Sequence, residues 1–306
     1  MTKILLFGKG GQVGWELQRS LVPLGEVVAL DFDSTDYCGN FNNLAGLADT
    51  VRAIKPDVIV NAGAHTAVDK GEAEPDLVRT INSLAPGALA TAAANIGAWL
   101  VHYSTDYVFD GSGSKPWLET DTPAPLSVYG HTKLEGEQLI QASGCKHLIF
   151  RTSWVYAARG GNFAKTMVKL AQERQKLKVV DDQIGAPTSA ELLADVTAHA
   201  IRHTLARPAA TSAHLSGVYH LVASGETSWF EYAKEVVALV QNEKYDIKII
   251  ANVIEPVPSS VYPTAAHRPL NSRLNTAKLQ NTFDLTLPHW KPGVVRMLTE
   301  FLETQP

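Results

Sequence analysis

The sequence predicts an α/β protein: a Rossmann-type, doubly wound parallel sheet with a smaller, mainly C-terminal lobe. Three observations support this fold class. In the first half, short apolar runs alternate with helical patterns, as in βαβ units. A glycine-rich segment directly follows the first apolar run. After about residue 152 the loops lengthen and proline becomes frequent, for example at Pro256, Pro258, Pro263 and Pro269, which indicates a second, less regular unit.

Apolar runs of strand length predict the strands of the sheet, each buried on both faces. They are residues 3–7, 27–30, 58–60, 99–103 and 147–151. The helices between and after them are expected to begin near Gln12, Leu44, Asp76, Val128 and Asn162. In the second half, residues 177–180 predict a strand, 190–202 a helix that returns to the main sheet, and 296–302 a final amphipathic helix.

Composition excludes several classes of protein. The 306 residues carry a net charge of −4, which gives no reason to expect nucleic acid as a partner. The chain has no apolar run of the length that a membrane helix needs, and its first residues lack the pattern of a signal peptide. Cys38 and Cys145 are too few for a disulfide framework or a metal cluster. We therefore expect a cytoplasmic protein without a membrane partner.

The glycine-rich segment has the context of a dinucleotide site. Gly8, Gly11 and Gly14 follow the first strand and open the first helix, so the backbone can approach a pyrophosphate at the helix N-terminus. Asp31 ends the second strand, where a carboxylate accepts hydrogen bonds from the adenosine ribose of NADH. Lys9 could offset the repulsion of the 2′-phosphate of NADPH, so both cofactors remain open. The alternative is a glycine-rich turn without a ligand.

Tyr129 and Lys133 form the candidate catalytic pair. Residues four apart share one face of a helix, so both side chains can reach one site. An ammonium about 4 Å from a phenolate stabilises it by at most about 4 kcal/mol at an effective dielectric of about 20. Lys133 is therefore expected to lower the pKa of Tyr129 and make it a usable general acid. The spacing alone is weak evidence in a chain with nine tyrosines.

Six segments together resemble the extended short-chain dehydrogenase/reductase superfamily, along essentially the whole chain. They are LFGKGGQVG (6–14), HTAVDK (65–70), HYSTDYVF (102–109), RTSWVY (151–156), DQIGAPT (182–188) and RPLNSRL (268–274). The first and third are shared broadly by the superfamily. The segments of the second half are similar to one branch, which reduces the C4 ketone of dTDP-4-dehydro-β-L-rhamnose to dTDP-β-L-rhamnose, the last step in making activated rhamnose for O-antigen and lipopolysaccharide.

This resemblance implies roles for the catalytic residues. Tyr129 delivers the proton, and Lys133 holds the nicotinamide ribose and lowers the pKa of Tyr129. Thr105 replaces the more usual Ser beside the carbonyl, where its hydroxyl can hydrogen-bond the developing alkoxide. Adjacent Ser104 should point the other way if strand geometry persists, so only one of the two can serve.

The resemblance also implies the binding residues. The pyrophosphate is assigned to Gly11, Gln12 and Val13 within the loop Gly8 to Gly14, and the adenosine ribose to Asp31. Phe41 and Asn40 lie beside the adenine, with Phe41 as a packing wall. The remaining cofactor contacts are Ala64, His65, Thr66, Tyr103 and Lys133. Asp106 and Trp154 face the nucleotide sugar together with Thr105 and Tyr129, and Arg268 and Arg273 are the candidates for its diphosphate, the alternative being surface arginines.

Some members of this branch bind Mg²⁺ between the subunits of a homodimer through glutamates. The matching positions carry Glu16, Glu191 and Glu300. Such an ion would be structural, held by hard oxygen ligands, and would take no part in hydride transfer. A solvated surface is an equally good interpretation of each residue.

The predicted organisation follows from these assignments. Residues 1–152, with a returning segment at about 175–206, form the dinucleotide-binding domain, and 153–174 and 207–306 form the substrate-binding lobe. Two alternatives to the reductase remain. A nucleotide-sugar epimerase or dehydratase uses the same Tyr-Lys pair, although a dehydratase usually carries an acidic pair after the Thr, where this chain has Asp106 and Tyr107. A non-catalytic regulatory or binding module can also keep this fold.

Overall fold

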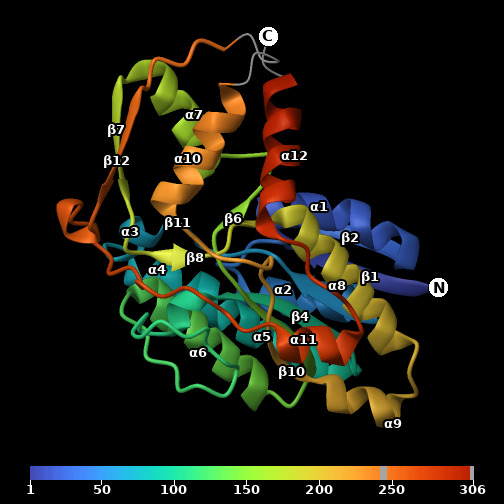
Figure 1. Ribbon diagram of the computed structural model, residues 1–306. Helices are drawn as coiled ribbons and strands as arrows, with labels where there is room; N and C mark the ends of the chain where they lie inside the picture. The colour runs from blue at the N-terminus through green and yellow to red at the C-terminus, as the bar shows by residue number, and fades with distance from the viewer. Residues whose placement is uncertain (242–246, 304–306) are drawn as a thin grey trace.

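A computed structural model describes residues 1–241 and 247–303 of the chain. At its centre is a parallel sheet of six strands in the order β10-β5-β4-β3-β1-β2 (Figure 1). The strands are β1 (Thr2–Phe7), β2 (Gly25–Leu30), β3 (Val58–Asn61), β4 (Trp99–Thr105), β5 (Lys146–Thr152) and β10 (Gly217–His220). The five strands predicted from the apolar runs are confirmed. The strand order reverses between β1 and β3, which places a crevice at their carboxyl ends.

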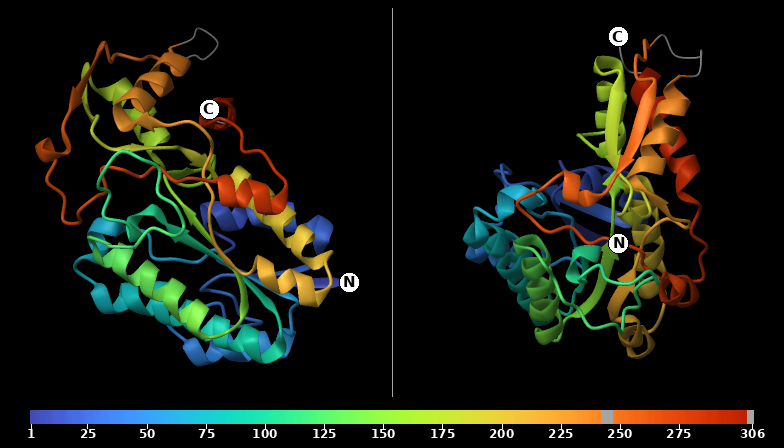
Figure 2. Two further views of the ribbon diagram at one scale, coloured as in Figure 1. Left: turned by 60° about the horizontal axis from the view of Figure 1, so that its bottom comes forward. Right: turned by 60° about the vertical axis from the view of Figure 1, so that its left-hand side comes forward.

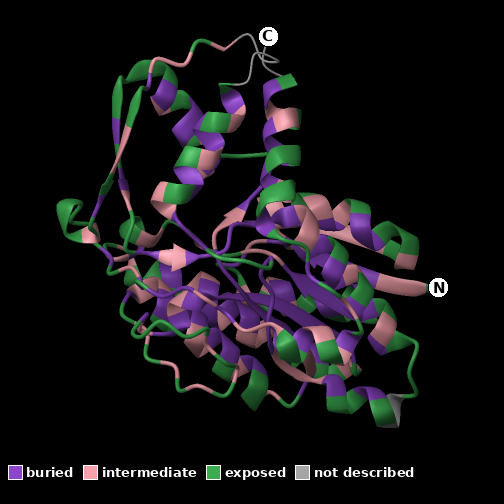
Figure 3. Ribbon diagram, in the orientation of Figure 1, coloured by how far each residue is buried: buried purple, intermediate pink, exposed green. Residues whose placement is uncertain are grey.

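Helices cover both faces of this sheet (Figures 1 and 2). One face carries α2 (Leu44–Ile54), α5 (Ala85–Ile96) and α6 (Val128–Ala142), and the other carries α1 (Gln12–Leu21), α8 (Ala190–Leu205) and α11 (Ala277–Phe283). Along β1 the side chains alternate between these layers: Ile4 and Leu6 join the core under α1 and α8, and Leu5 and Phe7 the core under α2 and α5. The central strands β3 and β4 are accordingly buried along their whole length, whereas the edge strand β2, which was also expected to be buried on both faces, is mostly only partly buried (Figure 3).

Polar caps explain where the main helices begin. A side-chain oxygen accepts a hydrogen bond from a backbone N–H of the first turn in each of these helices, which satisfies an otherwise unpaired donor. The caps are Asn43 for α2, Ser127 for α6, Asn162 for α7 (Phe163–Glu173), Ser189 for α8 and Ser228 for α10 (Trp229–Val240). The predicted helix starts near Gln12, Leu44, Val128 and Asn162 are therefore confirmed, and the start near Asp76 is α4 (Pro75–Arg79).

Short elements connect the main ones. The short helices are α3 (Val68–Gly71), α9 (Ala209–Ser212) and the 3₁₀ turns η1 (Val22–Leu24), η3 (Asp106–Val108), η4 (Ala213–Leu215) and η5 (Ser259–Val261). A π-helical turn, η2 (Thr80–Leu84), separates α4 from α5. The short strands pair as β6 (Val155–Tyr156) with β9 (Thr188–Ser189) and β8 (Ile184–Gly185) with β11 (Thr227–Ser228).

The lobe rises from the carboxyl edge of the sheet and has its own core (Figure 1). Its ribbon of two parallel strands, β7 (Lys176–Val180) and β12 (Val253–Val257), lies with α7, α10 and α12 (Trp290–Glu303). Met167, Val236 and Trp290 are among the buried residues of this second core. The predicted strand 177–180 and the final helix 296–302 thus exist, the latter as the end of α12.

Three segments, β7, β10 and α11, lie outside the domains that the predicted boundaries assign to them. β7 falls in the range 175–206 that was expected to return to the main sheet, but it pairs with β12 in the lobe, and only α8 returns. Alternate residues of β7 are exposed, which suits a two-stranded ribbon and not a doubly covered sheet. β10 and α11 fall in the range 207–306 but belong to the main sheet and its covering layer. Residues 242–246 and 304–306 of that range lie outside the described residues.

Candidate active site

The glycine loop packs tightly between the ends of β1 and β3. Gly8 has a φ of +81°, and a Cβ there would lie 2.7 Å from the backbone nitrogen of Gly63. A Cβ on Gly14 would lie 1.9 Å from the carbonyl oxygen of Gly8, so only glycine fits. Gly11 caps α1 without a side-chain hydrogen bond, which leaves the first N–H groups of the helix for an anion. A dinucleotide fits this cradle.

Three neighbours shape the rest of the loop. The carboxylate of Asp31 accepts hydrogen bonds from the Gly10 N–H (2.8 Å) and from the Phe32 N–H (2.9 Å). Gln12 Nε2 donates to the carbonyl of Gly161 (3.0 Å), and Arg159 Nε donates to the carbonyl of Gly10 (3.3 Å). The loop after β6 therefore lies against the glycine loop. Arg159 was not predicted, and its place in a surface loop gives no sequence signal.

The expected adenine neighbours have different surroundings. Phe41 is 8% exposed; its ring lies edge-to-face with Phe7, and a Cβ on Gly63 would touch it. Phe41 is thus a fixed apolar surface, and its contact with an adenine stays a prediction. Asn40 Oδ1 accepts from the Asn42 N–H (3.0 Å) in a local turn. The side chain of Val13 packs on the core between α1 and the sheet. Only the backbone of Val13 is therefore left to contact a cofactor.

The segment that follows β3 is anchored by hydrogen bonds of its backbone. Ala64 and Thr66 are exposed, and His65 between them is half-buried. The His65 N–H donates to Asn82 Oδ1 (2.8 Å), and Asn82 Nδ2 donates to the His65 carbonyl (3.0 Å). Asn82 is buried in the π-helical turn η2, a type of turn that often marks functional sites. Asn82 was not predicted. A polar amide between apolar residues of a helical segment is the feature of the sequence that could have indicated it.

Thr105, Asp106 and Tyr129 come together at the end of β4. Thr105 Oγ1 accepts from the Tyr107 N–H (3.2 Å) and donates to Asp106 Oδ1 (3.1 Å). Burial raises the pKa of Tyr129 to about 12, although a hydrogen bond with Thr105 lowers it. The ring of Tyr107 stands edge-on to that of Tyr129, with centroids 5.5 Å apart. The Thr105 hydroxyl and the protonated phenol of Tyr129 are thus neighbours, which is the arrangement that protonation of a substrate oxygen requires.

Lys133 is buried beside the same strand. Its Nζ donates to the Tyr103 carbonyl (2.5 Å) and lies 3.1 Å from His102 Nε2. Burial lowers the pKa of Lys133 to about 8, against the opposing charge of Glu137. The expected net lowering of the pKa of Tyr129 by Lys133 is wrong, because burial of the phenol outweighs its favourable contacts and the amine is bound to the strand. The raised pKa suits a proton donor.

Ser104 points away from the reacting groups, as predicted. Its hydroxyl donates to Glu137 Oε1 (2.5 Å), and Arg151 donates to both oxygens of the same carboxylate (2.9 and 2.6 Å). All three side chains are buried, so they tie β4, α6 and β5 together behind the site. Of the two adjacent hydroxyls, only that of Thr105 lies on the side of Tyr129.

Two further predicted residues are buried at this edge. Burial raises the pKa of Asp106 to about 6, although hydrogen bonds from Ser272 and Thr105 lower it. The Tyr103 hydroxyl bonds Thr197 of α8 (2.6 Å), so its ring lies on the α8 side and its carbonyl faces Lys133. Any contact of Tyr103 with a cofactor would therefore involve its backbone.

A cavity of about 780 Å³ opens beside Tyr107, between the sheet edge and the lobe. Trp154 and Trp229 line it and stack with ring centroids 3.6 Å apart. Trp154 has a φ of +50°, a conformation rare for a bulky side chain, and such strain is concentrated at functional sites. Trp229 and Phe163, which also lines the cavity, were not predicted. Both residues begin helices of the lobe. An aromatic residue in a helix is usually interpreted as part of the hydrophobic core, so neither residue indicated a cavity.

The two candidate arginines are not brought together. Arg268 lines the cavity and donates to Asp69 Oδ2 (2.5 Å), which connects the loop before α11 with α3. Arg273 lies outside the cavity lining and donates to Glu226 Oε2 (2.8 Å) beside a separate hollow. Only Arg268 is placed to contact a ligand in the cavity.

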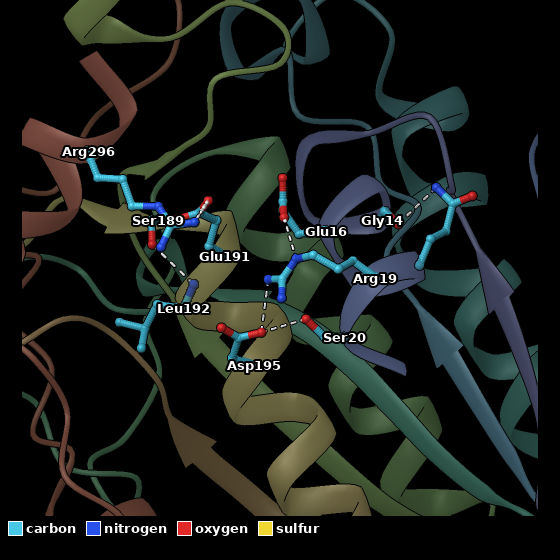
Figure 4. Close-up of polar contacts among 10 residues, drawn as sticks. Gly14, Glu16, Arg19, Ser20, Ser189, Glu191, Leu192, Asp195 and Arg296 are labelled. Atoms are coloured by element: carbon cyan, nitrogen blue, oxygen red, sulfur yellow. Dashed lines mark hydrogen bonds and ion pairs between the residues drawn. The ribbon is translucent and has the colours of Figure 1, made fainter. Parts of the chain in front are cut away.

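Two of the expected metal ligands, Glu16 of α1 and Glu191 of α8, lie on one face of the molecule beside Arg296 of α12 (Figure 4), and the third, Glu300 of α12, is near enough to act on the pKa of Glu191. Burial and the neighbouring Glu16 and Glu300 raise the pKa of Glu191, while Arg296 lowers it. Glu191 pairs with Arg296 (3.4 Å) and Glu16 with Arg19 (3.4 Å). Over residues 1–241 and 247–303, no group of three or more Asp, Glu, His or Cys side chains is arranged to hold a metal ion. The single chain thus does not form the site.

Comparison with known proteins gives one consistent family. The family described as the RmlD substrate binding domain matches residues 1–303. The dTDP-4-dehydrorhamnose reductase of Escherichia coli K12 is 59% identical over 303 residues, which is 98% of each chain. Among solved structures, a dTDP-4-dehydrorhamnose reductase from Clostridium acetobutylicum is 36% identical, with a TM-score of 0.86 over 97% of this chain and 99% of that one. One from Bacillus anthracis, in complex with NADP, is 34% identical, with a TM-score of 0.86 over 98% and 100%.

Proposed function

The chain belongs to the RmlD substrate binding domain family, and we propose that it reduces the C4 ketone of dTDP-4-dehydro-β-L-rhamnose to dTDP-β-L-rhamnose. One observation carries this proposal. Thr105 ends β4, Lys133 hydrogen-bonds the carbonyl of Tyr103 on the same strand, and Tyr129 contacts Tyr107, which lines the aromatic cavity. The glycine loop follows β1, two positions along the sheet from β4. Relatives at 59% identity over nearly the full length are named for this reaction.

The side chains divide the reaction between them. When bound, the reduced nicotinamide cofactor supplies the hydride that adds to C4 of the sugar. Tyr129 protonates the C4 oxygen; its raised pKa of about 12 keeps it protonated at neutral pH. The Thr105 hydroxyl has one proton, which turns from Asp106 to that oxygen and stabilises its developing negative charge. Lys133 keeps at least one N–H for the nicotinamide ribose, because its bond to Tyr103 uses only one donor.

The choice between NADH and NADPH depends on the charges around the glycine loop. Asp31 disfavours a 2′-phosphate by repulsion, but its carboxylate is already bound to two backbone N–H groups. Lys9 and Arg159 are cations in and beside the same loop. These charges support use of both cofactors, with Asp31→Ser shifting the preference toward NADPH. The ratio of kcat/KM for the two cofactors measures this shift.

Recognition of the nucleotide sugar is assigned to the cavity. Trp154 and Arg268 line it, which supports a contact of Trp154 with the sugar and of Arg268 with the diphosphate, where a guanidinium binds two phosphate oxygens. Asp106 does not line the cavity but precedes Tyr107, which does, and is proposed to face the sugar from that side. Arg273 is assigned no such contact, because it pairs with Glu226 outside the cavity. We propose domain boundaries that put β10 and α11 in the cofactor domain and β7 in the lobe, which the pairing of β10 with β5 and of β7 with β12 supports.

An intersubunit Mg²⁺ and a homodimer are proposals that rest on the face of Glu16, Glu191 and Glu300. A metal there requires the carboxylates to leave Arg19 and Arg296, so a second chain must supply further ligands or charge. Analytical ultracentrifugation with Mg²⁺ and with EDTA tests this. A dimer lost on chelation supports the site, and a monomer under both conditions rejects it.

The location is proposed to be the cytoplasm. Cys38 and Cys145 are both free, as is usual in a reducing compartment. Among the residues whose structure is described, no helix has the length and apolarity required to span a bilayer. Fractionation of cells followed by immunoblotting tests this location.

One assay separates the proposed reaction from its rivals. The 4-keto sugar nucleotide is generated enzymatically, and oxidation of NADH and of NADPH is followed together with product formation. A reductase consumes one reduced cofactor per product, an epimerase none in net terms, and a binding module forms no product. Absence of turnover with both cofactors would overturn the assignment.

A further inference from the structure

His102 is a fully buried histidine that contacts the buried lysine of the catalytic pair. It lies on β4 and is 1% exposed. Its Nε2 is 3.1 Å from Lys133 Nζ, and its Nδ1 is 3.0 Å from Asn61 Nδ2. Asn61 ends β3, so three side chains connect two neighbouring strands with α6.

The hydrogen bonds fix where the proton of His102 lies. The backbone N–H of Gly63 donates to Asn61 Oδ1 (3.0 Å), and a backbone N–H can only donate, so this bond sets the orientation of the amide. Asn61 Nδ2 then donates to His102 Nδ1, which must carry a lone pair. Burial lowers the pKa of His102 well below its usual range, so the ring is neutral. Its proton therefore lies on Nε2.

This proton faces the amine of Lys133. An uncharged amine accepts a hydrogen bond from the Nε2–H of His102, donates one to the Tyr103 carbonyl and keeps one N–H for a ligand. An ammonium has three donors and no lone pair, so its contact with Nε2–H sets two donors face to face. The uncharged form is the one whose hydrogen bonds are all satisfied.

Charged groups around Lys133 do not reverse this preference. Glu137, one turn further along α6, favours the ammonium. Its carboxylate is bound by Arg151 and by Ser104, however, so much of its charge is already compensated. The groups from the strands are the Tyr103 carbonyl, the Asn61 amide and His102, all of them neutral.

We propose that His102, held by Asn61 with its proton on Nε2, is a positioning residue that stabilises the uncharged amine of Lys133 and directs its remaining N–H toward the cofactor. Lys133 therefore changes its protonation state close to neutral pH. The consequence for catalysis rests on the proposed function; the tautomer and the titration do not.

The tautomer can be tested on the wild-type protein. Long-range ¹H–¹⁵N correlation spectra distinguish a protonated from an unprotonated ring nitrogen. We expect a protonated Nε2 and a bare Nδ1 for His102, assigned by its loss in His102→Gln. A protonated Nδ1 would overturn the proposal without the use of any functional variant.

The titration of Lys133 tests the energetic part. Protein labelled with [¹³Cε]lysine is titrated by NMR, with Lys133 assigned through Lys133→Arg. His102→Gln should offer a carbonyl oxygen to the ammonium without adding a charge. Asn61→Asp should turn Nε2 into an acceptor but also brings a carboxylate near Lys133, so His102→Gln is the deciding variant. Both should raise the midpoint by roughly one pH unit or more. Val101→Ala, a core change on the same strand, should leave it unchanged.

An unmoved midpoint in His102→Gln would overturn the proposal. In the cofactor-oxidation assay, kcat should depend on pH with an apparent pKa that reports the titration of Lys133. This apparent pKa should shift in each variant by the same amount as the NMR midpoint. Failure of wild-type turnover would remove the proposed function but leave the tautomer and the midpoints as measured, so the two failures are distinguishable.

Discussion

The carboxyl edge of the main sheet and the lobe above it are stabilised by different kinds of contact. Behind the reacting groups, Ser104, Glu137 and Arg151 form buried hydrogen bonds of 2.5 to 2.9 Å between three elements of the sheet domain. The lobe side of the cavity depends on the stacked rings of Trp154 and Trp229, and the loop that carries Arg268 is joined to α3 by a partly exposed ion pair.

This difference suits two tasks: the sheet edge carries out the chemical step, and the lobe recognises the nucleotide sugar. Hydride and proton transfer need reacting atoms held to a fraction of an ångström, which rigid strands and buried bonds provide. A nucleotide sugar must enter and leave, so its neighbours lie on loops and helix ends that can move. Changes at the sheet edge should therefore alter kcat or stability, and changes in the lobe should alter KM.

The largest effect is expected from Tyr129→Phe. The substitution removes the proton donor but keeps the ring, so kcat should fall by roughly 10²–10⁴-fold with little change in the binding of cofactor. Steady-state kinetics and cofactor titration measure both. Tyr219→Phe, which removes a hydroxyl bonded to Leu215 away from the site, is the control. Retention of near wild-type kcat in Tyr129→Phe would refute its role.

Glu137→Gln should cause the largest loss of stability. It leaves Arg151 as a buried charge without its carboxylate, and breaking such a pair costs about 3–5 kcal/mol. Urea unfolding measures the free energy of unfolding. Glu135→Gln breaks a more exposed pair with Arg79 on the same helix and should cost less than about 1 kcal/mol. Equal losses in the two variants would contradict the rigid-edge interpretation.

Trp229→Ala tests the lobe. Losing the stack with Trp154 should raise KM for the sugar nucleotide by about tenfold, which corresponds to about 1.4 kcal/mol, while KM for the cofactor stays constant. Phe230→Ala, the next residue of α10, is the matched control. A drop in kcat without a change in KM would show that Trp229 positions the reacting groups and not the ligand.

The same division explains what could be predicted from sequence. The glycine loop, Asp31 and Tyr129 with Lys133 follow local rules of strand, turn and helix, so their places were predictable. Ser104 and Thr105 were separated correctly because alternation in a strand is a local property.

Contacts between segments that lie far apart in the sequence could not be predicted. β10 has four residues and joins β5 only through a nonlocal pairing, so its sequence carries little signal. The direction of the pKa shift of Tyr129 depends on burial, which the spacing to Lys133 does not reveal. Arg273 and Arg268 lie close in the sequence, yet they face different hollows because of the path of the loop between them.

The smallest expected effect is also the most discriminating for the lobe. Asp69 holds Arg268 through an ion pair that is partly exposed, worth up to about 1 kcal/mol. If Arg268 binds the diphosphate, Asp69 competes with the ligand, and Asp69→Asn should lower KM for the sugar nucleotide by up to about fivefold. If Arg268 only fastens the loop, the same change should raise KM. Lys70→Met, which removes the neighbouring pair with Glu74, is the control and should leave KM unchanged. The sign of the change therefore assigns Arg268 to recognition or to structure, because one guanidinium cannot keep its bond to Asp69 and make the same bond to a phosphate.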